Sequence, residues 1–352
     1  MAKSSKDVGA AQGPAEHGGS ALHDTLVRSQ GASEEAPHTG MPLAEASLET
    51  LTQGPIGVRK AHKMYIGGAF VRSESGRCWQ VAESNGAPEG EFAAAASGSK
   101  ENIPLASRKD ARDAVLAAKN AWEPWAGRTA FNRGQILYRM AEMLHARKGE
   151  LAQSLARGGV PARLAAREVA AACDRAIAYA GWTDKYQSLL SSLNPVSGPH
   201  FNFTLPESMG VVAIVAPPRP TLLGLVGAML PVITSGNTCV VLASEADPRT
   251  ALTFCEVLAT SDLPGGVVNV LTGKVAEVLP TLGKHMEVAA LDLHGVDVAL
   301  VKSVEESAVV NVKRVRTRAL LEELWFDAVA TESPRWIERF VEMKTVWHPS
   351  GV

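Results

Sequence analysis

The sequence predicts an α/β protein built on a doubly wound, Rossmann-like parallel sheet. Between residues 211 and 293, runs that are apolar at almost every position alternate with segments of helical pattern. Strands buried on both faces have such runs, and the intervening helices cover the two faces of a parallel sheet. The chain is 46% hydrophobic, which is enough to form a sizeable core. Ligand sites of this fold lie beyond the carboxyl ends of the strands.

The alternating block contains predicted strands and predicted helices in regular order. The predicted strands are Val211–Val215, Thr238–Leu242, Val267–Leu271 and Val288–Leu293. The predicted helices are Leu222–Thr234, Arg249–Ala259 and Ala276–Leu282. Ser235-Gly236-Asn237 ends the first of these helices, as helix-terminating residues do.

Ahead of this block, the chain predicts strands followed by helices. Tyr65–Val71 and Cys78–Val81 flank Ser75-Gly76, which indicates a hairpin. Glu83–Glu101 is rich in small residues and predicts a loop. A helix is expected to begin at Ser107, with Asp110 in its first turn. Two further helices are expected at Arg133–Arg147 and Glu168–Tyr186.

The two ends of the chain differ in character from the block. Residues 1–60 are rich in Gly, Ala, Ser and Glu, so we expect a disordered tail. Met41–Leu51 is either a weak amphipathic helix or part of that tail. Residues 296–334 are charged and helical in pattern, which predicts a solvated linker. The C-terminal segment, residues 335–352, contains Phe340–Trp347. Side chains of this stretch alternate as they do in a half-buried strand, so we expect a strand there.

A further strand is expected at Phe201–Leu205, within an arm hairpin at about residues 194–208. Pro195, Pro199 and Pro206 bracket it, and proline is excluded from central strands, so we expect an edge or arm position. The strand and the C-terminal strand either pair with another chain or complete the sheet of their own chain.

Composition excludes several classes of function. Lys plus Arg number 35 and Asp plus Glu 37, so no large basic field attracts nucleic acid or acidic membranes. The four scattered cysteines contain no CxxC pair, so we expect neither a zinc site nor a disulfide framework, nor any other metal. The longest apolar run, Thr221–Ile233, falls short of the roughly 20 residues that span a bilayer. A cytoplasmic protein with reduced thiols is expected.

Several stretches resemble motifs of the aldehyde dehydrogenase family, in the family's order. They are Tyr65–Val81, Arg133–Leu151, Ser208–Pro217, Gly236–Glu245 and Leu263–Gly273. The last three resemble "P-x-G-V-V-x-I-x-P", "G-N-T-V-V-x-K-P-S-E" and "L-P-x-G-V-x-N-V-x-T-G". The resemblance implies that residues 61–295 form the NAD-binding-type domain, and that Phe201–Leu205 and the C-terminal strand form the family's oligomerisation elements. It also implies NAD or NADP contacts at Pro217, Ser244, Glu245 and Gly266.

The sequence departs from the family at three cofactor-proximal positions. Pro218-Arg219 stand where the family has Trp and Asn, and that Asn helps to hold the oxyanion. Leu242 replaces the lysine that contacts the adenosine ribose. Asp292 places a carboxylate where the pyrophosphate should lie, and like charges repel. Glu245 is retained and is expected to accept hydrogen bonds from ribose hydroxyls.

The family's catalytic residues have no counterpart. Neither a "G-Q-x-C" nucleophile nor an "E-L-G-G" general base is present, and none of Cys78, Cys173, Cys239 and Cys255 has a setting that would activate a thiol. His294, near a strand end, is expected to be either a surface residue or a ligand contact.

Three functions follow as hypotheses. The first is a non-catalytic subunit that pairs with a full-length aldehyde dehydrogenase or with itself. The second is a nucleotide-binding or sensing module. The third is a residual aldehyde oxidoreductase with rearranged chemistry, which would use Arg219 or a partner's cysteine.

Overall fold

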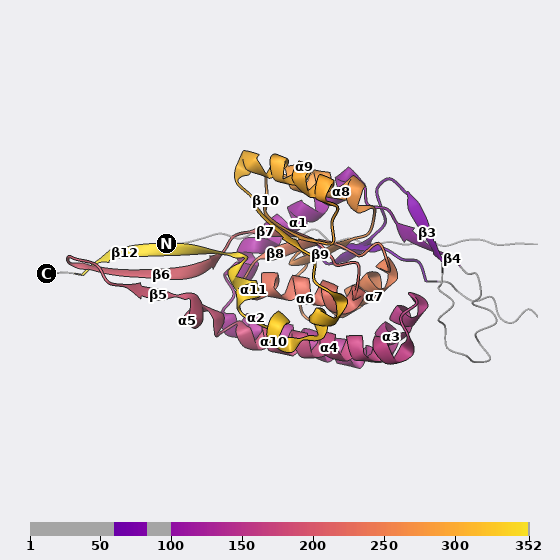
Figure 1. Cartoon of the computed structure of the whole chain (residues 1–352), viewed down its shortest axis with the longest axis horizontal. Coiled ribbons are helices and arrows are strands. Elements are labelled where there is room, and N and C mark those ends of the chain that lie inside the picture. The colour runs from indigo at the N-terminus through magenta and orange to yellow at the C-terminus, as the bar shows by residue number, and fades with distance from the viewer. Residues whose placement is uncertain (1–59, 83–99, 351–352) are drawn as a thin grey trace, which may run out of the picture. The chain divides into compact units, whose positions relative to one another are not determined.

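The structure is a computed structural model that describes residues 60–82 and 100–350. All of them belong to one unit, which runs from Arg59 to Val352. The expected disordered tail, the Met41–Leu51 helix and most of the expected loop after Glu83 lie outside the described residues. Within the unit, a seven-stranded sheet forms the body and a three-stranded sheet forms an arm that extends from it (Figure 1).

The large sheet has the doubly wound, Rossmann-like order expected from the sequence. Its order is β11-β10-β7-β8-β9-β1-β2, in which the first five strands are parallel and the last two form an antiparallel hairpin. The strands are β1 (Met64–Ile66), β2 (Ala69–Val71), β7 (Val211–Val215), β8 (Thr238–Leu242), β9 (Val268–Leu271), β10 (Val288–His294) and β11 (Arg314–Arg318). The four strands predicted from apolar runs are therefore confirmed.

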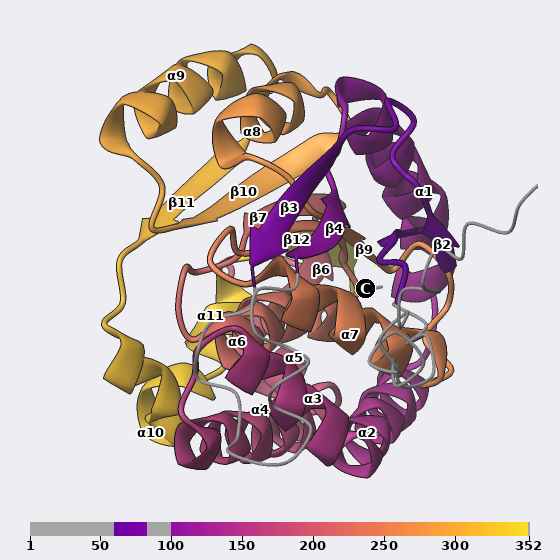
Figure 2. The same ribbon diagram turned by 90° about the vertical axis from the view of Figure 1, so that its right-hand side faces the viewer.

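Helices cover both faces of this sheet. One face packs against α1 (Arg108–Ala126), α8 (Val275–Lys284) and α9 (Val298–Ala308). The other packs against α6 (Thr221–Thr234) and α7 (Pro248–Ala259), outside which lie α2 (Ala130–Ala146), α3 (Lys148–Arg157) and α4 (Ala162–Trp182). Figure 2 shows the same layers from the side.

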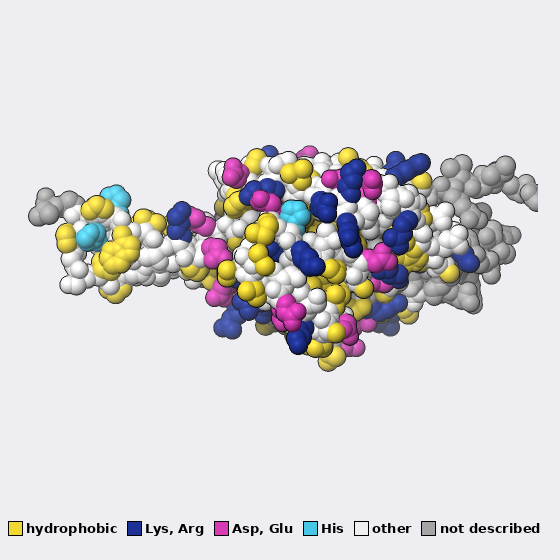
Figure 3. Space-filling model, turned by 90° about the horizontal axis from the view of Figure 1, so that it is seen from above, with side chains coloured by type: hydrophobic (Ala, Val, Ile, Leu, Met, Phe, Trp, Pro, Cys, Tyr) yellow, Lys and Arg dark blue, Asp and Glu magenta, His cyan; other side chains and the backbone are white. Residues whose placement is uncertain are grey.

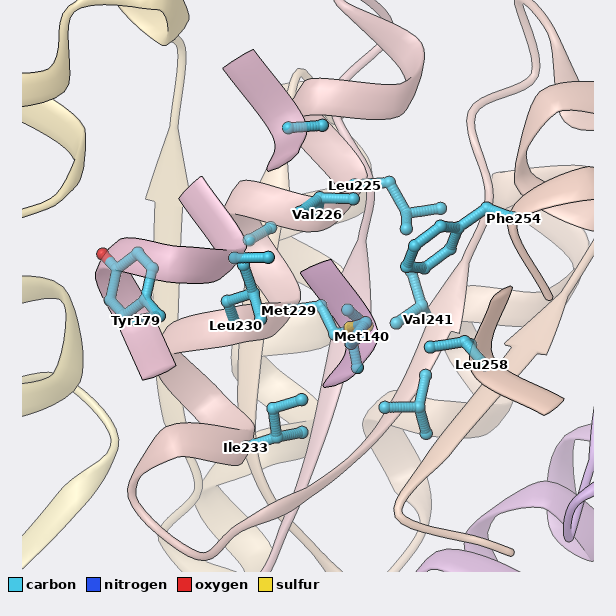
Figure 4. Close-up of a cluster of buried hydrophobic side chains, with 14 of the residues drawn as sticks. Met140, Tyr179, Leu225, Val226, Met229, Leu230, Ile233, Val241, Phe254 and Leu258 are labelled. Carbon is cyan, nitrogen blue, oxygen red and sulfur yellow. The ribbon is translucent and has the colours of Figure 1, made fainter. Parts of the chain in front are cut away.

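The main core lies around α6, the helix between β7 and β8. All its residues are buried, because it lies between the sheet and the outer helices. Leu225, Met229 and Ile233 of α6 meet Met140 of α2 and Phe254 of α7 in this core (Figure 4). A helix apolar on every side can be stable only in such an interior position.

The N-terminal elements correct the expected hairpin. The turn lies at Gly67-Gly68, between β1 and β2, and not at Ser75-Gly76. The next strand, β3 (Cys78–Ala82), pairs with β4 (Lys100–Pro104) in a separate two-stranded sheet. Lys100 and Glu101 therefore belong to a strand, and not to the loop that the sequence predicts. Long-range pairing with β4, which no local pattern reveals, decides this register.

Helix α1 begins as the sequence predicts. Ser107 is its N-cap, and Ser107 and Asp110 form a reciprocal capping box with distances of 3.2 Å from Asp110 N to Ser107 Oγ and 2.7 Å from Ser107 N to Asp110 Oδ2. These bonds satisfy two of the backbone donors that a helix start leaves free.

The arm consists of β12 (Val341–Pro349), β6 (His200–Ser208) and β5 (Ser192–Asn194), after the short helix α5 (Tyr186–Leu190). The predicted arm is confirmed, but β6 is its central strand and not an edge. Pro206 is tolerated because β5 pairs only with residues 202–204 of β6, so the strand has no partner on that side at Pro206.

The prediction of a charged helical linker at residues 296–334 is wrong for residues 314–318. Residues 314–318 form β11, a parallel edge strand beside β10, and α9 precedes it. Arg314, Arg316 and Arg318 therefore lie on a strand and not on a solvated helix face. The segment after β11 holds only short helices, which are the 3₁₀-helix η4 (Glu322–Phe326), α10 (Ala328–Thr331) and α11 (Arg335–Glu338).

This segment is anchored on α4 by buried hydrogen bonds to backbone carbonyls. Arg175 Nη2 donates to Trp325 O at 2.8 Å, Tyr179 Oη to Thr331 O at 2.9 Å and Trp182 Nε1 to Glu332 O at 2.7 Å. Gly227 of α6 makes room for it, since a Cβ there would meet Trp325 Cζ3 at 3.0 Å. The segment is thus part of the body and not a detached connection.

One buried asparagine joins the arm to the body. Asn237 Oδ1 accepts from Met209 N at 2.7 Å and Gly210 N at 2.9 Å, directly after β6. Asn237 Nδ2 donates to Phe340 O at 2.6 Å, directly before β12, and to Ser235 Oγ at 2.8 Å. Both main strands of the arm are therefore fixed where they leave the body.

Among the described residues, no helix has the length and apolar character that crossing a membrane requires.

We expect Asn237→Ala to lower the free energy of unfolding by about 2–4 kcal/mol, because it leaves buried backbone groups of Met209, Gly210 and Phe340 without partners. Urea denaturation measures the loss. Asn120→Ala, at an exposed position of α1, is the control and should cost less than about 0.5 kcal/mol. Equal effects of the two substitutions would contradict the proposed anchoring.

Candidate functional site

The carboxyl edge of the large sheet is where this fold places ligands. Strands β7 and β10 are neighbours, and their connections leave in opposite directions, β7 through α6 to β8 and β10 through α9 to β11. This is the topological switch point of a doubly wound sheet, beside which such proteins bind dinucleotides. Pro217, Ser244 and Glu245, three of the residues predicted to contact a cofactor, follow β7 and β8 at this edge.

The Glu245 carboxylate is already bound within the chain. Its Oε1 accepts from Val275 N at 2.8 Å, at the first turn of α8, and its Oε2 lies 2.8 Å from Lys274 Nζ. The negative charge is favourable there because the start of a helix carries partial positive charge. Both carboxylate oxygens thus hold α8 in place.

Ser244 and Pro217 are also engaged locally. Ser244 Oγ donates to Pro218 O at 3.0 Å and accepts from Ala246 N at 3.2 Å, so it links the loops after β7 and β8. Pro217 is buried against Gly224 of α6. Arg219, at the position where the family resemblance implies an oxyanion contact, is exposed.

Gly266 lies away from the other three predicted residues. It precedes β9, at the amino end of the strand, with φ of +90°. A Cβ there would meet Ala117 O of α1 at 2.6 Å, so the glycine permits close packing of α1 on the sheet. The roles of all four residues in cofactor binding stay predictions.

A buried carboxylate occupies the start of α6. Glu168 of α4, only 1% exposed, accepts from Leu222 N at 2.7 Å and Leu223 N at 3.1 Å. Burial raises the pKa of this carboxyl group, and the two backbone bonds act in the opposite direction. The first helix after β7 is where a dinucleotide phosphate lies in this fold, so an internal carboxylate holds that position here.

The end of β10 carries a buried charged cluster that the sequence did not predict. Asp292 is fully buried, with Oδ1 3.1 Å from Arg318 Nε and Oδ2 3.0 Å from His294 Nε2. Arg318 of β11 thus offsets the charge of Asp292, and the expected repulsion between this carboxylate and a pyrophosphate stays a prediction. The alternation of arginines in Arg314–Arg318 was the available signal for that strand.

His294 is 2% exposed, so the expected surface position is also wrong. Its ring lies 5.4 Å from that of Trp325, which is fully buried and comes from the segment after β11. Trp325 in turn lies 5.7 Å from Trp336. These side chains fill the α6 side of the sheet beside the end of β10.

The three buried cysteines offer no activated thiolate. Burial raises the pKa of the Cys173 thiol to about 11 and also raises the pKa values of Cys239 and Cys255. Cys78 is exposed on β3. Reactive thiolates need a lowered pKa in an accessible, electropositive pocket, which the three buried cysteines lack.

Several described residues at this edge that would contact a dinucleotide are already engaged within the chain. Glu245, which would bind ribose hydroxyls, stabilises α8, and Glu168 occupies the start of α6. The side chain of Leu242, at the end of β8, has no hydrogen-bonding group. Among the described residues, no group of three or more His, Cys, Asp or Glu side chains could hold a metal ion.

Comparisons with known proteins identify relatives. Residues 93–318 match the model of the aldehyde dehydrogenase family. The cytosolic 10-formyltetrahydrofolate dehydrogenase of Homo sapiens is 30% identical over 296 residues, which are 82% of this chain and 31% of that protein. The hydroxyisobutyraldehyde dehydrogenase of Mycolicibacterium austroafricanum is 33% identical over 235 residues, 66% of this chain and 44% of that protein.

Solved structures give the same result for the fold. The NAD⁺ complex of an aldehyde dehydrogenase from Bacillus cereus superimposes with a TM-score of 0.66 at 26% identity, and PnpE from Pseudomonas sp. WBC-3 with 0.67 at 27%. Each match covers 74% of this chain and 51% of the other. The chain thus spans about half or less of the length of the relatives it matches.

Two substitutions of Glu168 should differ in their effect on the free energy of unfolding. Glu168→Ala should lower the free energy of unfolding by about 2–4 kcal/mol, because Leu222 N and Leu223 N lose their acceptor. Glu168→Gln keeps an acceptor oxygen and should stay within about 1 kcal/mol of the parent protein. Similar losses in both would show that the charge, and not the acceptor, is what α6 needs.

The raised pKa of Glu168 also predicts a dependence on pH. The group binds its proton more tightly in the folded than in the unfolded state, so its contribution to stability is full below its ordinary pKa of 4.5. That contribution falls as pH rises through the folded-state pKa. Stability measured against pH should therefore drop over this range in the parent protein relative to Glu168→Gln. Parallel pH profiles would exclude the raised pKa.

Thiol alkylation tests the states of the cysteines. Under native conditions at neutral pH we expect iodoacetamide to label Cys78 alone, since Cys173, Cys239 and Cys255 are buried. All four should be labelled in denaturant, which provides the control. Mass spectrometry of the digested protein identifies the sites. Fast native labelling of a second cysteine would reveal an accessible thiolate and favour cysteine chemistry.

Proposed function

The chain belongs to the aldehyde dehydrogenase family, and from this premise we propose that it is a non-catalytic subunit that assembles through its arm. The proposed partner is a full-length NAD(P)-dependent aldehyde dehydrogenase or a second copy of this chain. The arm's exposed apolar faces carry the proposal. The proposed location is the cytoplasm, where unpaired cysteines such as these persist.

The arm exposes apolar side chains on both faces. By strand register, Leu193, Phe201 and Leu205 share one face and are 67%, 51% and 38% exposed. Met343 and Trp347 share the other and are 48% and 61% exposed. The expected half-buried strand at Phe340–Trp347 is thus wrong beyond Val341, because the described residues cover neither face of β12.

Such a sheet is a poor surface for an unpartnered protein. Figure 3 shows apolar and histidine side chains toward the end of the arm, with Lys and Glu nearer the body. One long edge of β12 also has no strand partner among the described residues. Exposed apolar patches and unpaired edges of this kind mark protein interfaces.

The remaining features support a subunit without its own chemistry. The sequence holds no counterpart of the family's nucleophile or general base between β10 and β12. Three of the four cysteines are buried. A residual oxidoreductase would have to rely on Cys78 or on groups from a partner chain, and no surrounding residue of Cys78 supplies a base at hydrogen-bond distance among those described.

The competing proposal is a nucleotide-binding module, which the NAD complexes of similar proteins favour. The engaged carboxylates of Glu168 and Glu245 weigh against it. Calorimetric titration of the full chain with NAD, NADP and their reduced forms separates the two proposals, because saturable heat would favour the module.

The assembly proposal predicts that one charged substitution on either face of the arm weakens association. Leu205→Glu and Trp347→Glu should each raise the dissociation constant about 30-fold or more, the effect of losing an interface hot spot. Analytical ultracentrifugation measures it, first with the chain alone and then with a full-length aldehyde dehydrogenase from the same cell. Val310→Glu, 77% exposed and away from the arm, is the control.

Circular dichroism should show that all three variants remain folded. A parent protein that is monomeric alone, and that also ignores every full-length family member of the same cell, would exclude the proposed assembly.

A further inference from the structure

A pocket of about 360 Å³ lies between β11 and the segment that follows it. Its charged and aromatic lining consists of Arg316, Arg318, Trp336 and Arg339. None of the described residues that line the pocket is acidic. It lies near the carboxyl end of β11, at the same edge of the sheet where doubly wound proteins bind ligands.

Arg318 is the central group of this pocket. Its side chain is only 7% exposed, and its guanidinium carbon lies 3.9 Å from the centre of the Trp336 ring. Asp292 approaches the Nε side of the group, at 3.1 Å. Nη1 and Nη2 have no hydrogen-bond partner among the described residues. Buried donors without partners are costly, so a ligand acceptor in the pocket would stabilise them.

The other two arginines add charge that the described part of the chain does not offset. Neither Arg316 nor Arg339 forms an ion pair with a described carboxylate, and Asp292 divides its two oxygens between Arg318 and His294. Arg339 also lies over the Trp336 ring, at 5.3 Å from its centre. Burial, together with the charges of Arg339 and Arg316, lowers the pKa of Arg318 to about 10, against the opposing effect of Asp292.

We propose that the pocket formed by Arg316, Arg318, Arg339 and Trp336 is a binding site for a phosphate-type oxyanion. A guanidinium group donates parallel hydrogen bonds to two oxygens of one oxyanion. A phosphate offers acceptors in several directions, as arginines from different elements require, whereas a carboxylate offers two oxygens in one plane. Trp336 fixes the planes of two of these arginines by cation–π contact.

The phosphate group could come from a free anion or from a nucleotide, since the recognising chemistry is the same. The proposal does not depend on the assembly function, because the arm and the pocket share no residue. Arg316 is exposed and Arg339 is partly exposed, so both can be replaced without opening the core. Arg318 is unsuitable for a first test, since its loss leaves the buried Asp292 carboxylate without its cation.

The test is calorimetric titration of the full chain with inorganic phosphate and with pyrophosphate, at low ionic strength in a phosphate-free buffer. We expect saturable binding to one site. Arg316→Ala and Arg339→Ala should each weaken it about tenfold, the effect of losing a hydrogen bond to a charged group. Arg339→Lys keeps the charge and loses the fork, so its affinity should lie between those of the parent and Arg339→Ala.

Arg163→Ala is the matched control, because Arg163 is an exposed arginine of α4 outside the pocket. It should leave the affinity unchanged. Absence of saturable heat with both anions, or equal weakening in the control, overturns the proposal. Once anion binding is measured, NAD is added as a competitor. Displacement of the anion by NAD identifies a nucleotide as the source of the phosphate, and failure of NAD to displace it identifies a free anion.

Discussion

The four hydrogen bonds of the Asn237 side chain are the constraint on which the arrangement of body and arm depends. They join the end of β6, the turn before β8 and the start of β12, which are far apart in the sequence. The side chain is fully buried, and both its oxygen and its nitrogen have partners. Since a buried amide with lost partners is costly, the arm has one stable direction relative to the sheet.

The polar groups at the carboxyl edge are used for the fold itself. Glu168 stabilises α6, Glu245 stabilises α8, and Asp292 is paired with Arg318 and His294. In a dinucleotide-binding protein of this topology, the same edge holds phosphates and ribose. Internal carboxylates supply comparable charge at helix starts. Three carboxylates of this edge therefore have partners within the chain, whereas Nη1 and Nη2 of Arg318, at the end of β11, are buried without one among the described residues.

The predictable part of the fold consists of the elements whose pattern is local. Strands β7, β8, β9 and β10 are apolar on both faces, and Ser107 with Asp110 forms a capping box that four consecutive residues of sequence suffice to recognise. The hairpin at Gly67-Gly68, the pairing of β3 with β4 and the charged edge strand β11 were missed. For β3 and β11 a partner distant in the sequence decides the structure, and an edge strand that alternates arginines resembles a charged surface helix in composition. The Gly67-Gly68 hairpin is local, and the Ser75-Gly76 signal competed with it.

For the candidate site, the sequence by itself determined the doubly wound sheet, the family motifs around Pro217, Ser244 and Glu245, and the absence of the family's catalytic motifs, because these are properties of short segments. Only the tertiary structure decided what those side chains contact. His294 is buried, and Asp292 pairs with Arg318. Glu245 binds the first turn of α8. Arg316, Arg318 and Arg339 line one pocket. The physical reason is that burial and electrostatic interaction depend on distances in space, and folding sets those distances between residues far apart in the chain.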